Sequence, residues 1–316
     1  MIRVFTDPRC LEHSSPAGFP EVPRRLQGIL DELEQRGHPM VREAHHEAAD
    51  EMVRAIHDPA YVDRFQRCVA RGDGLLDSAD NPLSAGTWDA AWGAVETLLS
   101  AVDHQLAEGG GTFAAVRPPG HHAEHALAMG FCYLNNVAVA AEYLRRRHGM
   151  ERVAIFDFDV HHGNGTQHLF EERGDVLYAS THQFPFYPGT GAASERGRGA
   201  GEGTTVNAPL AAGSGDDELE AAVQEIILPA LREYRPEALL LSAGFDAWKG
   251  DPLGGLAVSR DAFRRLGLQL AELADEVCGG RMVSVLEGGY DLEALPSLVA
   301  GYLDGCAGRE ENGAQS

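Results

Sequence analysis

Hydrophobic residues occur along the chain in two patterns, as short uninterrupted runs and as longer stretches that repeat every three to four positions. The short runs end in glycine or polar residues, which is typical of strands buried on both faces of a parallel sheet. Strands are predicted at residues 2–5, 112–116, 153–156, 176–180, 238–242 and 282–286.

The longer stretches have the helical period and lie between the predicted strands. Ser259 is a candidate N-cap for one helix, and Pro296 is expected in the first turn of the last helix. Helices are predicted at residues 24–36, 87–107, 135–147, 216–234, 259–277 and 292–303, and loops at residues 71–86 and 184–203.

The alternation of strands and helices predicts an α/β fold with a mostly parallel sheet that is covered by helices on both faces. The chain has 316 residues, of which 44% are hydrophobic, and this is enough for one large core. We therefore expect a single domain over residues 1–316, with a polar tail that frays from about residue 305.

Composition bears on location and partners. The five cysteines are scattered and form no C-x-x-C motif, which favours reduced thiols in the cytoplasm. The first nine residues lack the architecture of a signal peptide, and no apolar run approaches the roughly 20 residues that span a bilayer. The net charge of −22 disfavours nucleic-acid binding and would attract a basic peptide, although solubility or a salty interior explains it equally well. The sequence does not fix the oligomeric state, and a homo-oligomer stays open.

Polar clusters follow most of the predicted strands directly. The carboxyl ends of parallel strands meet at one edge of a sheet, and binding sites form at that edge. We expect five clusters to lie there: Gly-His-His at 120–122, Asp-Val-His-His at 159–162, Ser-Thr-His at 180–182, Gly-Phe-Asp at 244–246 and Gly-Gly-Tyr at 288–290.

The second of these clusters is a candidate metal site. If the chain stays extended, Asp157, Asp159 and His161 point to one face, where two carboxylates and an imidazole need a cation between them. Asp246, which ends another strand, is the best third ligand beside Asp159 and His161. Three protein ligands leave a fourth position open, as in catalytic zinc sites. The alternative is a salt-bridged strand end.

Two further features suggest catalysis. His121 and His122 follow a rigid Pro-Pro-Gly turn, and a histidine pair near a metal could act as a base, or it could lie on the surface. Tyr290 could place its hydroxyl on a developing oxyanion, although taken alone it reads as a packed core tyrosine. Gly163 and Gly165 predict a tight turn behind the metal ligands.

Several motifs together resemble the histone deacetylase family, and more narrowly its class II and bacterial amidohydrolase branch. They run in order over almost the whole chain. They are RPPGHH (117–122), MGFCYLNN (129–136), DFDVHHGNGTQ (157–167), YPGTG (187–191), SAGFD (242–246), DPLGG (251–255) and EGGYD (287–291).

This resemblance implies a three-layer α/β/α arginase-like fold with a sheet of about eight strands. It also implies zinc-dependent hydrolysis of an acetylated amine, with zinc on Asp159, His161 and Asp246. Ferrous iron suits the same ligands and stays open. A ureohydrolase on this fold would need further aspartates at the strand ends, and a non-catalytic acyl-binding protein would not need the catalytic side chains.

The resemblance assigns roles to the remaining polar residues. Tyr290 polarises the acetyl carbonyl together with the metal, and His122 is the base, assisted by His121. Asp157 orients His121. Asn164 stands behind the second histidine, where other branches have an aspartate, and its amide adds no negative charge.

The resemblance further implies potassium sites and a substrate tunnel. Leu253 replaces an acidic residue of polyamine-selective relatives, which favours acetyl-lysine in a peptide or protein over acetylpolyamines or other small acylated amines. The first potassium site would use Asp157, Ser180 and carbonyls of Asp159, His161 and Thr181, and a second would use Phe170, Arg173, Val176 and Thr204. The tunnel would be lined by Gly130, Phe131, Tyr187 and Leu253, with Asp80 at its rim.

Overall fold

The computed structural model describes residues 2–42 and 44–308. Within these residues, eight parallel strands form one sheet in the order β2-β1-β3-β8-β7-β4-β5-β6. In chain order the strands are β1 (Arg3–Thr6), β2 (Met40–Arg42), β3 (Thr112–Ala114), β4 (Val153–Asp157), β5 (Val176–Gln183), β6 (Thr205–Leu210), β7 (Ala238–Ala243) and β8 (Met282–Leu286).

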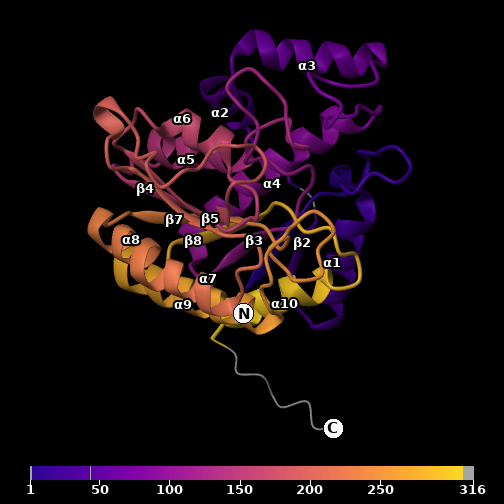
Figure 1. Cartoon of the computed structure of the whole chain (residues 1–316). Coiled ribbons are helices and arrows are strands. Elements are labelled where there is room, and N and C mark those ends of the chain that lie inside the picture. Colours follow the sequence, from indigo (N-terminus) through magenta and orange to yellow (C-terminus); the bar gives the residue numbers. More distant parts are fainter. Residues whose placement is uncertain (1, 43, 309–316) are drawn as a thin grey trace.

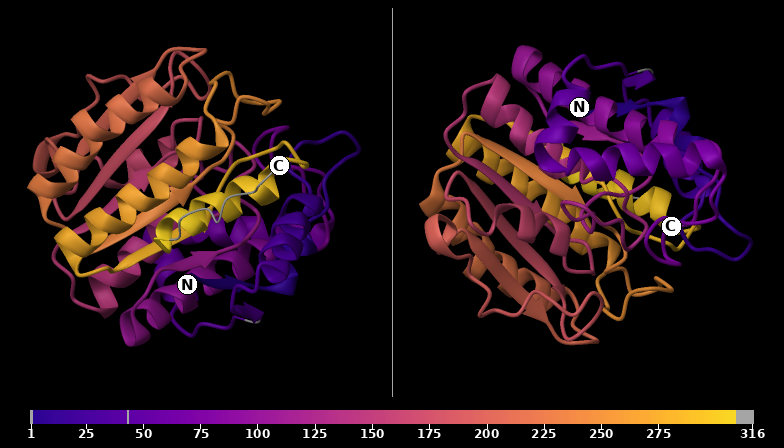
Figure 2. Two further views of the ribbon diagram at one scale, coloured as in Figure 1. Left: turned by 90° about the horizontal axis from the view of Figure 1, so that it is seen from below. Right: turned by 90° about the horizontal axis from the view of Figure 1, so that it is seen from above.

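Helices cover both faces of this sheet (Figures 1 and 2). One layer consists of α1 (Pro23–Gln35), α7 (Asp216–Ala222), α8 (Leu228–Tyr234), α9 (Arg260–Cys278) and α10 (Leu295–Cys306), in which α9 packs on α7, α8 and α10. The opposite layer consists of α2 (Ala49–Ile56), α3 (Pro59–Arg71), α4 (Thr87–Glu108), α5 (Asn136–Arg147) and α6 (Asn164–Phe170). The predicted three-layer α/β/α architecture is therefore confirmed.

The central strands are buried along their whole length, as their uninterrupted hydrophobic runs predict. Every residue of β4, β7 and β8 is buried, and Phe156 of β4 pairs with Leu241 of β7. All six predicted strands are present. The edge strands β2 and β6 were not predicted, and neither were helices α2 and α3.

Helix boundaries agree with the predicted capping residues. The Ser259 hydroxyl accepts a hydrogen bond from the Ala262 N–H, and Pro296 lies in the first turn of α10. The predicted helix at residues 216–234 is divided by the π-helical turn η3 (Val223–Ile227), where the Leu228 N–H bonds back to the Val223 carbonyl. Pro229 follows and has no N–H to donate, so the regular helical pattern cannot pass through this position.

The structure differs from the prediction at residues 163–165, and it describes only part of the predicted tail. The turn predicted at residues 163–165 is instead the first turn of α6, which begins at Asn164. Gly165 is needed for packing, because a Cβ there would lie 2.3 Å from the Ala123 carbonyl oxygen. In the tail predicted to fray from about residue 305, α10 continues through Cys306, and residues 309–316 lie outside the described part of the chain.

All five cysteines are free thiols, as the scattered spacing predicts. No helix within residues 2–42 and 44–308 combines the length and the apolar character needed to cross a membrane.

Candidate active site

The candidate site lies at the carboxyl edge of four neighbouring strands, β3, β8, β7 and β4. The loop that leaves each strand carries polar residues, which the shared edge brings together. His121 and His122 follow β3, Tyr290 follows β8, Asp246 follows β7, and Asp159 and His161 follow β4. The remaining predicted cluster, Ser-Thr-His at 180–182, does not follow a strand. Its residues lie inside β5, which continues to Gln183.

The three predicted metal ligands converge on one point. Nδ1 of His161 lies 3.1 Å from Oδ1 of Asp159 and 3.2 Å from Oδ2 of Asp246. One ligand atom from each residue lies within 4.8 Å of the others, and all three side chains are buried or nearly so. Such a set of two oxygens and one nitrogen is suited to zinc or ferrous iron.

The electrostatics of this group indicate a place for a positive charge. Burial lowers the pKa of His161, but hydrogen bonds to Asp159 and Asp246 outweigh it and raise the pKa to about 10. Burial and the nearby Asp159 carboxylate raise the pKa of Asp246 to about 7. Both carboxylates contact Nδ1 of His161, so the group favours a positive charge at its centre, which a divalent cation would supply.

The backbone around the two carboxylates leaves no space for side chains. The Gly288 N–H donates to Oδ2 of Asp159, and the Val160 N–H donates to Oδ1 of Asp246, each at 2.8 Å. A Cβ on Gly288 would lie 2.2 Å from Oδ2 of Asp246 and 2.5 Å from Oδ2 of Asp159. The carboxylates are therefore oriented by main-chain donors, and the donor set fits a bound metal ion.

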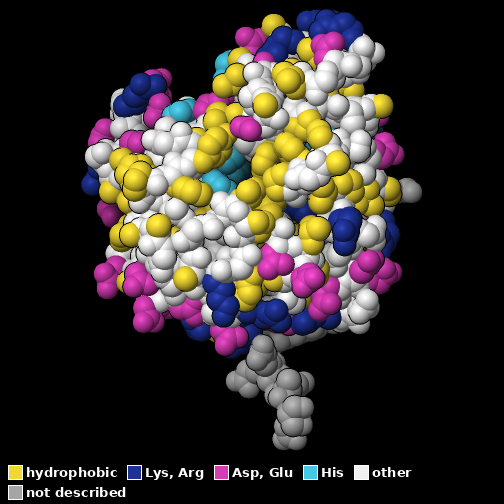
Figure 3. Space-filling view, turned by 45° about the vertical axis from the view of Figure 1, so that its right-hand side comes forward, with side chains coloured by type: hydrophobic (Ala, Val, Ile, Leu, Met, Phe, Trp, Pro, Cys, Tyr) yellow, Lys and Arg dark blue, Asp and Glu magenta, His cyan; other side chains and the backbone are white. Residues whose placement is uncertain are grey.

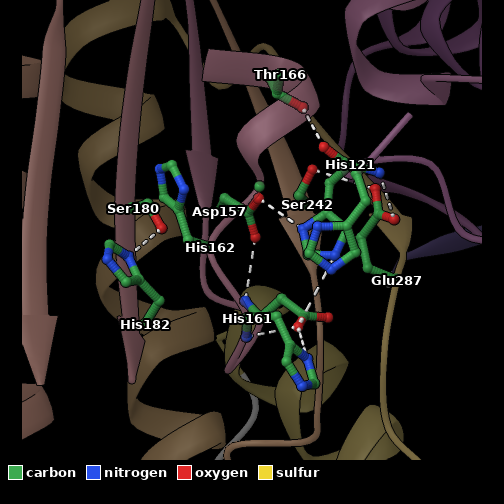
Figure 4. A network of polar contacts seen from close by, with 12 residues as sticks. His121, Asp157, His161, His162, Thr166, Ser180, His182, Ser242 and Glu287 are labelled. Atoms are coloured by element: carbon green, nitrogen blue, oxygen red, sulfur yellow. Dashed lines mark hydrogen bonds and ion pairs between the residues drawn. The ribbon is translucent and has the colours of Figure 1, made fainter. Parts of the chain in front are cut away.

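Asp157 does not point to the same place as Asp159 and His161, as it would if the strand stayed extended. β4 ends at Asp157, and the chain then bends, so strict alternation does not continue to His161. Asp157 turns toward the histidine pair, with Oδ2 2.9 Å from Nδ1 of His121, while its Oδ1 accepts from the Asp159 N–H (Figure 4).

The two histidines have opposite environments although their rings are only 4.0 Å apart. Burial lowers the pKa of His121, but the carboxylates of Asp157 and Asp159 raise it to about 10. Burial, reinforced by His121 and His161, holds the pKa of His122 well below its usual value. Nδ1 of His122 lies 2.7 Å from Oδ1 of Asn164. The arrangement therefore provides a charged and a neutral imidazole side by side.

A pocket of about 250 Å³ leads to these groups. In the space-filling view, histidine side chains lie at the bottom of a hollow that is rimmed by hydrophobic residues (Figure 3). All the residues expected to contact substrate line it. The lining consists of Asp80, His122, Gly130, Phe131, His161, Phe186, Tyr187, Leu253 and Tyr290.

Three residues near the site were not predicted. Phe186 lines the pocket and stacks on His161 at 5.5 Å between ring centroids. The carboxylate of Glu287 accepts the N–H groups of Gly120 and His121, and Arg25 of α1 lies 4.6 Å from the Tyr290 ring. Phe186 is adjacent to the tunnel motif and Glu287 lies inside one, but no local signal marks Arg25.

The residues expected to bind potassium lie in two groups. In the first, Ser180 is paired with Asp157 across β5 and β4, and the buried Thr181 hydroxyl has no hydrogen-bond partner among the described residues. In the second, the Thr204 hydroxyl donates to the Arg173 carbonyl, and the Arg173 N–H donates to the Phe170 carbonyl. Val176 begins β5.

Fold and site together define the class of protein: a three-layer α/β/α protein with a candidate metal-dependent catalytic site at the carboxyl edge of its sheet. The histone deacetylase domain model matches residues 19–306. The chain is 39% identical to chloroplastic histone deacetylase 14 of Arabidopsis thaliana, over 94% of this chain and 74% of the relative. It is 40% identical to a histone deacetylase-like amidohydrolase of Pseudomonas aeruginosa, over 89% and 74% of the two chains.

A solved structure extends this similarity to three dimensions. The crystal structure of acetylpolyamine aminohydrolase from Burkholderia pseudomallei has a TM-score of 0.86 and 33% identity, covering 96% of this chain and 98% of that one. The chain belongs to the histone deacetylase family, and the bacterial relatives support its bacterial branch. It has the deacetylase or amidohydrolase activity of that family, which acts on acetylated substrates and is generally zinc-dependent.

Proposed function

We propose that the protein hydrolyses the acetyl amide of acetyl-lysine in peptides or proteins, releasing acetate and a free amine. The observation that carries this proposal is the lining of the pocket. Leu253, Phe131 and Tyr187 give it apolar walls that suit the methylene chain of acetyl-lysine. The proposal also matches the net charge of −22, which favours basic peptides.

Each polar group in the pocket then has a chemical role. Zinc, held by Asp159, His161 and Asp246, would supply a Lewis acid for the acetyl carbonyl. His122 is neutral, so it can accept the proton of the attacking water, while the charged His121 beside it is oriented by Asp157. Burial raises the pKa of Tyr290 well above its usual value, so its hydroxyl stays protonated and can donate to the developing oxyanion.

Other cations belong to the same proposal. Ferrous iron would suit the Asp, His, Asp set as well as zinc. A structural potassium ion would lie near Asp157, Ser180 and carbonyls of Asp159, His161 and Thr181, and the pairing of Asp157 with Ser180 across β4 and β5 supports it. A second ion near residues 170–176 and Thr204 would tie α6 to β5. The five free thiols are consistent with a reducing compartment such as the cytoplasm.

A second candidate substrate is an acetylpolyamine or another small acylated amine. Asp80 at the pocket could attract a charged amine, and the Burkholderia relative is named for acetylpolyamine. However, Leu253 offers no charge, and a polyamine ammonium beside it would lose hydration without compensation.

A substrate panel on protein of defined metal content tests the choice. Acetyl-lysine peptides, acetylated polyamines and longer acyl-lysine peptides would be compared by kcat/KM with zinc and with ferrous iron. We expect acetyl-lysine peptides to be preferred. Cleavage of acetylpolyamines without acetate release from the peptides would overturn the proposal.

A non-catalytic acyl-binding role is tested with Tyr290→Phe. Removing the hydroxyl should lower kcat by about 100- to 1000-fold, because one oxyanion donor is lost. Bound zinc, measured by metal analysis, should be unchanged. An inactive wild type that binds zinc and acetyl-lysine peptide would instead favour the binding role.

A further inference from the structure

The orientation of the Asn164 side-chain amide determines which ring nitrogen of His122 carries the proton. Asn164 contacts Nδ1 of His122 through a side-chain amide, which presents an acceptor oxygen on one side and a donor nitrogen on the other. If the oxygen faces the ring, Nδ1 carries the proton and Nε2 is free to act as a base. If the amide turned over, the tautomer would reverse and the basic nitrogen would face Asn164 instead of the pocket.

A second residue on the far side of the amide decides between these orientations. Nδ2 of Asn164 lies 2.5 Å from Oε1 of Glu124. An ionised carboxylate only accepts hydrogen bonds, so the amide nitrogen must face Glu124 and the amide oxygen must face His122. The polarity of the whole chain of hydrogen bonds is therefore set at its outer end.

From this geometry we propose that Glu124 is a positioning residue for catalysis: through Asn164 it fixes the His122 tautomer that has its unprotonated nitrogen toward the substrate. The inference rests on the proposed role of His122 as the base. It adds a residue two hydrogen bonds away from the reacting atoms, which does not line the pocket.

The surroundings of Glu124 hold it in place. Its N–H donates to the Leu127 carbonyl at 3.0 Å, and its carbonyl lies 2.9 Å from Nδ1 of His57. Its carboxylate also contacts Nδ1 of His168, which follows Asn164 by one turn of α6, at 2.8 Å. The Glu124 side chain is 20% exposed, so it lies near the surface while Oε1 reaches inward to Asn164.

Glu124 also supplies a negative charge that the amide lacks. A carboxylate at position 164 would face the histidine directly, whereas here one carboxylate acts through one amide. The pair of positions 164 and 124 therefore carries a single negative charge. The proposal predicts that activity is retained when this charge lies at either position and falls when both positions carry a carboxylate.

The first test is a double-mutant cycle. Glu124→Gln keeps the shape but can present either a donor or an acceptor to Asn164, so kcat should fall about tenfold with KM unchanged. In an Asn164→Ala background the same change should alter kcat by less than about twofold, since the connection is already broken. Equal effects in both backgrounds would overturn the proposal.

The second test moves the charge. Asn164→Asp alone places two carboxylates in contact and should lower kcat. Adding Glu124→Gln to it restores one charge and one acceptor-only group, so kcat should recover to within a few-fold of wild type. A double variant no better than Asn164→Asp would contradict the proposal, because one acceptor-only group beside Nδ1 should be enough to hold the His122 tautomer.

Controls separate this proposal from the proposed function. Glu276→Gln removes a carboxylate that pairs with the exposed Arg232, far from the site, and should leave kcat unchanged. Thermal unfolding of each variant checks that it is folded. Assays use the best substrate of the panel, so an inactive wild type would refute the proposed function, whereas an active wild type with an equally active Glu124→Gln would refute only the role of Glu124.

Discussion

At the scale of single residues, the candidate metal site depends on the absence of a side chain at Gly288 as well as on the side chains of its ligands. Asp159 and Asp246 approach one another because Gly288 has no side chain between them. The Gly288 N–H also donates to Asp159. A glycine here therefore both makes room for the carboxylates and orients one of them.

Gly288→Ala should weaken zinc binding by about 10- to 100-fold, because the new methyl group would push both carboxylates out of position. Zinc competition with a chromogenic chelator measures the change. Gly74→Ala is a suitable control, since a Cβ there meets nothing within 4 Å. Unchanged zinc affinity in Gly288→Ala would mean that the ion is not held by these two carboxylates.

At the scale of elements, one buried histidine joins two helices of the same layer. His57 follows the last residue of α2, and its Nε2 accepts the N–H of Asn135, the N-cap of α5. Its Nδ1 lies 2.9 Å from the Glu124 carbonyl and must donate to it. Both ring nitrogens are thus used by the neutral form, and a second proton on Nε2 would break the contact with α5.

This histidine should make stability fall with acidification. Burial lowers the pKa of His57 from 6.5 to about 4 in the folded protein. Between these values the unfolded chain binds the extra proton and the folded one does not, so the free energy of unfolding should fall by up to about 3 kcal/mol as the pH drops from 6.5 to 4.

Urea unfolding at several pH values would measure this slope. His57→Gln should reduce it without abolishing it, because burial also lowers the pKa of His13 to about 4. If His57→Gln kept the full slope, the acid sensitivity would arise elsewhere.

The sequence predicts the central elements well and the edges poorly, for a physical reason. β4, β7 and β8 are buried on both faces and need uninterrupted hydrophobic residues. β2 has only three residues, none of them buried, and β6 contains Asn207 and Pro209, so neither gives a strong strand pattern.

The same distinction applies to the site. Asp159 and His161 are close in sequence and follow a strand, so their chemistry can be read locally. Arg25 reaches the site only through folding, because it comes from α1 and donates to the carbonyls of Glu287 and Gly289. Contacts between residues that lie more than 260 positions apart leave no pattern in a single sequence.

At the scale of the whole molecule, metal binding should be coupled to global stability. The candidate ligands come from β4 and β7, and the donors and neighbours that orient them come from β8 and β3, so four adjacent strands meet at one charged group. Without a cation, the buried carboxylates repel one another. Binding an ion therefore favours the folded chain over the unfolded one.

Removal of the metal by a chelator should lower the midpoint of thermal unfolding, and zinc should restore it. At a zinc concentration a thousand times its dissociation constant, the gain is about 4 kcal/mol. Asp246→Asn should lose this response, because one of the three ligands becomes a neutral amide. A wild-type midpoint that is indifferent to zinc would show that the ion binds elsewhere or not at all.

The position of the first strand has a practical consequence for anyone shortening the chain. The histone deacetylase match begins at residue 19, yet β1 lies inside the sheet, between β2 and β3, with Phe5 opposite Ala114. A recombinant fragment cut at residue 19 would strip β3 of its neighbour and bare a row of hydrogen-bonding groups that invites aggregation. Fragments for crystallisation or inhibitor screening should therefore retain the segment from residue 3 onward.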